Sequence, residues 1–378
     1  MPNPNAIVAT TIRFDPPLEG RDIGEAVGAE AGLTVDLGGD RRVRLDPQDR
    51  RSIGFATVLN QLAEQHLPAY IELDPDANTI ERLLIPTLGH VLSVRPNDAR
   101  RGLELQLDRS HARHLVPTDS PDREVLERDL RAALDSKRPI LLVEDFDGRV
   151  IDVREFTPDP DAPLPPFPGP GGEPVPIAWP WWHWLLWPFS KLWWWILYPW
   201  RWWHCPSSTQ AQAIFDAMDA TSCNPLTVPV PCIPFKYPDD GCWARASEMC
   251  RLMIAMGRDP AKVWIDGSLE VISPNKPGCH VYWGWHVAPT ICVRGRWWFT
   301  RRMVIDPSLV TTPVTEAQWK AIQGDPNATL TDTSHTVYWR NVQPTDPTYY
   351  WTNIHLATYR LKLYNRSIQF GPPPYVCP

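Results

Sequence analysis

The chain has 378 residues, a formal net charge of -7 and a sequence pI near 5.8. This length allows two domains with sizeable cores, and the acidic balance excludes the basic footprint of a nucleic-acid-binding protein. All 20 tryptophans and all eight cysteines lie from residue 179 onward, and Lys137 is the only lysine before that point. Such uneven usage predicts two regions with separate folds.

The N-terminus lacks a basic stretch followed by an apolar one, so we expect no ordinary secretory signal there. Eight cysteines in the second half are instead typical of a protein from an oxidising compartment. These two observations leave the localisation unknown, with a secreted or a membrane-associated protein as the alternatives.

Residues 1–156 alternate short strand-like and helix-like patterns and predict a separate N-terminal α+β domain. We expect strands at 6–14, 69–73 and 139–143 and helices at about 48–66 and 122–135. No polar residues of this region have a spacing that indicates catalysis. Its role is therefore unknown, and a pro-region, a binding module for substrate or partner, and a delivery domain all remain open.

Residues 157–178 are rich in proline and glycine, which cannot hold a helix or an interior strand. They predict an extended linker.

Residues 179–204 form a Trp-rich segment. Its length suits a transmembrane span, but Pro180, Pro188 and Pro199 interrupt it, and Lys191 is charged. Tryptophan prefers the membrane interface, where its ring is apolar and its N–H stays hydrated. We therefore expect interfacial membrane contact through this segment. Packing against a domain or a partner protein, and a true span, are the alternatives.

Residues 205–378 contain the chemically informative pattern. A helix is expected to begin at Cys242, with apolar residues at helical spacing and Gly257 as its stop. The helix N-terminus favours a thiolate at Cys242, and the Cys242 amide supplies one oxyanion donor. Gly241 permits an unusual backbone angle and close approach of a substrate.

His286 lies on an expected strand at 281–288, and Asp306 ends a second one at 297–305. The turn between them predicts neighbouring antiparallel strands, so the carboxylate can reach the imidazole. A thiol, an imidazole and a carboxylate are the parts of a nucleophilic acyl-transfer site. Taken singly, a cysteine like Cys242 is more often a disulfide half or a buried thiol, a histidine like His286 is more often structural, and an aspartate like Asp306 is more often a turn residue or cap.

The side chains that could bind a metal ion are those of Cys242, Cys250, Cys279 and His280. We expect no metal site, because these residues include no Cys-x2-Cys pair. If Cys242 is a free nucleophile, at most three disulfides form within the chain and one further thiol is left over.

Three motifs together resemble the bacterial protein glutaminase family. They are Gly-Cys-Trp-Ala-Arg-Ala at 241–246, His-Val-Ala at 286–288 and Ile-Asp-Pro-Ser-Leu at 305–309. The segment at 313–319 resembles the one that comes next along the chain in that family. Tyr338-Trp339-Arg340 and the region from Tyr349 to Tyr364 resemble that family's C-terminal strands. The similarity covers roughly residues 225–365.

The resemblance implies a papain-like and transglutaminase-like catalytic domain, in which a helix carrying the cysteine packs on an antiparallel sheet. It implies Cys242 as nucleophile, His286 as general base and acid, and Asp306 as the orienting carboxylate. The expected reaction is hydrolysis of protein-bound glutamine to glutamate and ammonia through a thioester, with no cofactor. The expected partner is a protein with an exposed glutamine.

We expect the substrate to reach the thiol past Gly241 through a narrow slot with aromatic walls. The candidates for these walls are Trp243, Trp285 and Trp283. Packing in the core explains the three tryptophans equally well.

Other interpretations stay open. The same triad serves transglutaminase-like transfer to an amine and proteolysis. A membrane-associated effector or toxin-like protein is another alternative, with a C-terminal domain that deamidates one target or only binds it. The N-terminal region also fits an inhibitory pro-domain that is cut within 157–178.

Overall fold

The computed structural model describes residues 5–29, 32–38, 41–157, 204–224, 232–296, 299–340 and 345–376. The predicted linker and Trp-rich segment lie almost wholly outside the described residues. None of the described helices is both long and apolar enough to cross a membrane. The chain forms two compact units, one made of residues 1–167 with 361–372 and the other of residues 168–360 with 373–378.

The first unit is a mixed α/β structure of three-stranded antiparallel sheets ordered β1-β5-β6, β2-β3-β4, β10-β9-β8 and β12-β11-β7. Its strands are β1 (Ala6–Ala9), β2 (Arg13–Asp15), β3 (Leu33–Asp36), β4 (Arg42–Leu45), β5 (Ala69–Leu73), β6 (Ile80–Leu84), β7 (Thr87–Gly89), β8 (Val91–Asn97), β9 (Gly102–Leu107), β10 (Arg113–Pro117), β11 (Ile140–Glu144) and β12 (Val150–Glu155). Its helices are α1 (Ile23–Gly28), α2 (Ser52–Glu64) and α3 (Arg123–Ser136).

Most elements predicted for this unit are present. Helices α2 and α3 and strands β5 and β11 fall close to the expected bounds, with the largest difference about one turn at the start of α2. The single strand expected at 6–14 is wrong, since it is two strands in different sheets. β1 pairs with β5 and β2 pairs with β3, so the chain changes its partner strand between them.

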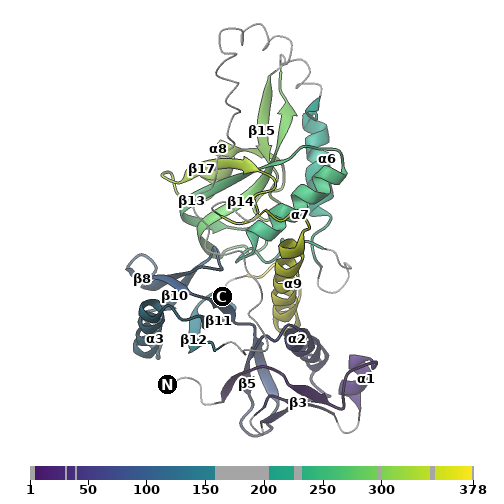
Figure 1. Ribbon diagram of the computed structural model, residues 1–378, viewed down its shortest axis with the longest axis vertical. Coiled ribbons are helices and arrows are strands. Elements are labelled where there is room, and N and C mark those ends of the chain that lie inside the picture. The colour runs from purple at the N-terminus through teal and green to yellow at the C-terminus, as the bar shows by residue number, and fades with distance from the viewer. Residues whose placement is uncertain are drawn as a thin grey trace. The chain divides into compact units, whose positions relative to one another are not determined.

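The second unit is also mixed α/β, and one antiparallel sheet ordered β16-β15-β14-β13-β17 organises it. Figure 1 shows helices α6 and α7 beside this sheet. The strands are β13 (Ala261–Ile272), β14 (His280–Arg294), β15 (Thr300–Val304), β16 (Val314–Thr315) and β17 (Thr329–Ser334), and the helices are α6 (Ser208–Asp219), α7 (Cys242–Ala255) and α8 (Glu316–Ala321). The predicted helix from Cys242 and the neighbouring antiparallel strands are confirmed.

Helix α9 (Tyr350–Phe370) corrects the sequence-based interpretation, because strands are expected in this region from the resemblance. Its buried side chains recur at helical spacing, at Leu356, Tyr359 and Leu363, and this period of three to four residues suits a helix rather than a strand. The helix continues from one unit into the other. Residues 361–372, which the sequence assigns to the C-terminal domain, belong to the first unit.

The described cysteines agree with the expected numbers of disulfides and free thiols. Cys205 is bonded to Cys292 and Cys223 to Cys232, and Cys279 is also disulfide-bonded. Cys242 and Cys250 are free and buried. The nucleophile candidate is therefore a thiol, and one further thiol is left over as predicted.

The Cys205–Cys292 and Cys223–Cys232 disulfides close loops of very different length, since their cysteines are 87 and 9 residues apart. Loop-closure entropy predicts that replacing Cys205 and Cys292 together by serine lowers the free energy of unfolding by about 4–5 kcal/mol. The same change at Cys223 and Cys232 should cost about 2–3 kcal/mol. Urea unfolding of the two double variants measures both values, and equal or reversed losses would contradict the prediction.

Candidate active site

Cys242 is the first residue of α7, and Gly241 precedes it with a φ of +86°. This left-handed conformation favours glycine. A Cβ at position 241 would also lie 2.3 Å from a ring carbon of Tyr359 on α9. Both constraints exclude a larger residue, so Gly241 sets the start of the helix and the position of the thiol.

His286 and Asp306 are brought together by the sheet. Thr290 of β14 pairs with Val304 of β15, and Asp306 lies two residues beyond this pair. The His286 Nε2 lies 2.9 Å from an Asp306 carboxylate oxygen. Cys242 Sγ and a ring nitrogen of His286 lie within 4.8 Å of each other, and the Val287 backbone amide acts to lower the pKa of Cys242.

The Asp306 carboxylate has further donors. The Trp319 indole N–H of α8 donates to the Oδ2 atom that also faces His286, at 2.9 Å. The Ser308 hydroxyl and backbone amide donate to Oδ1. Burial alone would raise the pKa of Asp306, but His286, Ser308 and Trp319 together hold it below its ordinary value. The group is therefore a buried carboxylate with hydrogen-bond donors at both oxygens.

The His286 ring lies between two indoles. Trp283 stacks on it with ring centroids 4.5 Å apart and planes 19° apart, and Trp319 approaches to 5.4 Å. Burial lowers the pKa of His286, although Asp306 acts in the opposite direction. At neutral pH the ring is thus a neutral imidazole held in a fixed orientation, as a general base must be.

The Cys242 thiol differs from the sequence expectation. The helix N-terminus favours a thiolate, but burial raises the pKa of Cys242 well above its ordinary value. The residue is only 1% exposed. Burial thus favours a neutral thiol at Cys242 and a neutral imidazole at His286.

The predicted slot residues Trp243 and Trp285 lie against each other, with ring centroids 5.7 Å apart. Both are buried. The Trp243 N–H donates to His355 Nδ1 of α9 at 2.8 Å, and Trp339 packs edge-on against Trp243 at 4.5 Å. In this structure the two indoles belong to an aromatic core beside Cys242, and a direct contact with substrate stays a prediction.

The sequence pattern gives little sign of several residues that build the site. Trp319 and Ser308 enter only as parts of a motif, although a serine two residues after an aspartate is a common partner for its carboxylate. Lys262 of β13 has no signal at all. Its buried ammonium donates to the Ser247 hydroxyl of α7 at 2.8 Å and to the Val337 carbonyl at 2.6 Å, so it fastens the helix that carries the thiol to the sheet.

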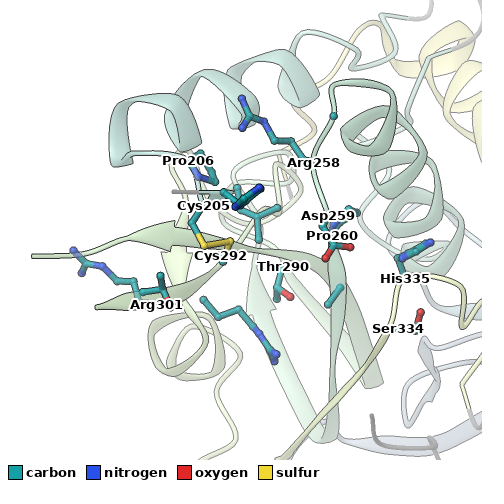
Figure 2. A pocket seen from close by; sticks show the side chains of 16 residues that line it. Cys205, Pro206, Arg258, Asp259, Pro260, Thr290, Cys292, Arg301, Ser334 and His335 are labelled. Atoms are coloured by element: carbon teal, nitrogen blue, oxygen red, sulfur yellow. A yellow bond between two sulfur atoms is a disulfide. The ribbon is translucent and has the colours of Figure 1, made fainter. Parts of the chain in front are cut away.

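A separate cavity of about 770 Å³ lies at the other end of α7. Figure 2 shows the Cys205–Cys292 disulfide in its wall, together with Arg258, Thr290 and Arg301. Arg258 comes just after the C-terminus of α7, whereas Cys242 starts it, so the two ends are roughly 20 Å apart. Cys242, His286 and Asp306 do not line this cavity. Of the metal candidates, Cys279 is disulfide-bonded and cannot supply a thiolate.

A family model and several solved structures match parts of the chain. Residues 211–323 match a family model described as glutaminase. A crystal structure of protein-glutaminase is 30% identical to the chain, which covers 89% of that protein; the match takes in 42% of this chain, with a TM-score of 0.38. The region that contains residues 211–323 is a glutaminase-family domain. The matched residues 211–323 of this glutaminase region include Cys242, His286 and Asp306.

Two further structures are similar to parts of the chain. The NMR structure of protein-glutaminase from Chryseobacterium proteolyticum is also 30% identical, with 42% of this chain and 89% of that one covered and a TM-score of 0.38. A crystal structure of pro-protein-glutaminase is 19% identical, covers 74% of this chain and 93% of its own, and has a TM-score of 0.47. No curated protein matches the chain.

Lys262 gives a pH-dependent prediction. Burial lowers its pKa from 10.5 to about 8, so the folded state loses its proton before the unfolded state does. Below pH 8 the buried ammonium of Lys262 lowers the free energy of unfolding by its full amount. This destabilisation disappears as the pH rises to 10.5. The free energy of unfolding of the wild type, relative to Lys262→Met, should rise by up to about 3 kcal/mol across this window. Urea unfolding at pH 7, 8, 9 and 10 measures it, and a constant difference would contradict the assignment.

Proposed function

We propose that the chain is an enzyme that deamidates protein-bound glutamine through a Cys242–His286–Asp306 triad and a thioester intermediate. The observation that carries the proposal is the 2.9 Å contact between His286 and the buried Asp306, with the Cys242 thiol beside the imidazole. The match of residues 211–323 to the glutaminase family supports the substrate class. The arrangement of α7 on an antiparallel sheet supports a papain-like and transglutaminase-like catalytic domain.

In the first half-reaction, Cys242 gives its proton to His286 as the sulfur attacks the side-chain carboxamide carbon of glutamine. The carbonyl oxygen becomes an oxyanion, for which the first backbone amides of α7, including that of Cys242, have no acceptor within the helix. His286 then protonates the amide nitrogen, the C–N bond breaks and ammonia departs. The acyl group stays bound to the Cys242 sulfur as a thioester. Asp306 stabilises the transient imidazolium through its contact with His286.

In the second half-reaction, His286 takes a proton from water, and the resulting hydroxide attacks the thioester carbonyl. The C–S bond breaks, the sulfur takes the proton back, and a glutamate side chain is released. Gly241, Trp243 and Trp285 remain in the proposal as residues of the substrate side. Gly241 supports this because its left-handed conformation fixes the first backbone amide of α7 beside the thiol, and the two indoles support it because Trp243 follows Cys242 and contacts Trp285.

The same triad can pass the acyl group to an amine or cleave a peptide bond, and these are the rival reactions. They differ in their products. Deamidation gives ammonia and a slightly heavier chain, transamidation gives ammonia together with a crosslink to the amine, and proteolysis gives fragments without ammonia.

The proposal is tested with an unfolded glutamine-rich protein, by ammonia release and intact mass. We expect ammonia and the mass gain of an amide-to-acid change, with both lost in Cys242→Ala. The matched control is Cys250→Ala, which removes the other described free thiol and should keep the activity. Crosslinks with added lysine, or peptide fragments, would replace the proposal by one of its rivals.

The donors to Asp306 give a graded prediction. Asp306→Asn should lower kcat/KM roughly 10⁴-fold, because the imidazole loses its orienting anion. Trp319→Phe keeps an aromatic ring beside His286 but removes the N–H donor to the carboxylate, and should cost about 10- to 100-fold.

The control for Trp319→Phe is Trp264→Phe, which loses a buried indole hydrogen bond to Thr333 in the same sheet. This variant should lose stability and keep kcat/KM. An equal loss of kcat/KM in both variants would assign the effect to general destabilisation.

A further inference from the structure

The last turns of α9 form one wall of the core of the first unit. Leu361 belongs to the same buried cluster as Phe55 and Leu59 of α2, and Tyr364 and Ile368 pack against that cluster. The first unit is therefore completed by a segment that lies more than 200 residues further along the sequence than α3.

Ile368 fits a gap in α2. A Cβ at Gly54 would lie 2.5 Å from both Cδ1 and Cγ1 of Ile368. Glycine within a helix is less stable than alanine, so its presence in α2 needs a packing reason. The space that Ile368 occupies supplies this reason, and it indicates that the two helices are shaped for each other.

Polar contacts fix the register of this packing. The Gln369 side-chain amide donates to the Leu83 carbonyl at 2.8 Å and accepts from the Leu83 amide at 3.4 Å. Asn365 donates to the same carbonyl at 2.9 Å, and Lys362 donates to Thr87 at 2.8 Å. Leu83 lies on β6, an edge strand of its sheet. The helix thus covers backbone groups that an edge strand would otherwise expose.

We propose that residues 361–370 are a built-in docking helix that keeps the N-terminal unit attached after the chain is cut between the two regions. This helix packs against α2 and forms hydrogen bonds with Leu83 of β6. Cleavage in the Pro/Gly-rich stretch at 157–178 therefore yields a two-fragment complex and does not by itself free the C-terminal region. This proposal concerns attachment and is independent of the chemistry at Cys242.

The test uses the full-length chain with a specific protease site introduced within residues 163–172. After cleavage without denaturant, the two fragments of the wild type should elute together on size exclusion, and a tag on the N-terminal fragment should retain the C-terminal one. Cut Ile368→Asp should separate into two species, because a carboxylate is placed in an apolar contact. The matched control is Ala357→Asp, an exposed position on the same helix, which should stay associated.

A second pair of variants tests the fit from the other side. Gly54→Val should weaken the retention of the cut chain, and adding Ile368→Ala should restore part of it, because the smaller side chain makes room. Circular dichroism of each uncut variant establishes that the chain is folded. Separation of the cut wild type, or undiminished retention of folded, cut Ile368→Asp, would overturn the proposal.

Discussion

The buried carboxylate of Asp306 is the constraint on which the rest of the site depends. An unpartnered carboxylate in the interior is strongly unfavourable, so its oxygens must meet donors from His286, Ser308 and Trp319 at once. These donors come from β14, from the turn after β15 and from α8. The pairing of β14 with β15, and of β15 with the short strand β16 that leads into α8, brings them together. The sheet register is thus fixed by the same contacts that orient the imidazole.

The thiol is placed by a different set of contacts. Gly241 starts α7 in a left-handed conformation that other residues rarely adopt, and the Tyr359 ring fills the space beside it. Lys262 fastens the second turn of α7 to the sheet through Ser247. Burial favours the neutral forms of Cys242 and His286, so the proposed reaction requires proton transfer within the pair at the moment of attack.

Local patterns predict much of this arrangement. The helix from Cys242, its stop at Gly257 and the antiparallel strands of His286 and Asp306 are expected from short-range periodicity and turn residues. The raised pKa of Cys242 is not, because burial arises from distant packing and outweighs the local helix dipole. The role of Trp319 escapes prediction because an indole N–H has no periodic signature. Strands are wrongly expected in place of α9 because the resemblance outweighs the helical spacing of its buried residues. No local pattern reveals that the last turns of this helix complete the other unit.

The most direct test of the account is to trap the acyl-enzyme. Wild type mixed with a short glutamine peptide and quenched rapidly in acid should give a species with the mass of the enzyme plus the peptide less ammonia, and peptide mapping should place the adduct on Cys242. His286→Ala should fail to form it. An adduct on another residue, or ammonia release with no covalent species and undiminished rate in Cys242→Ala, would contradict the claim that this thiol is the nucleophile.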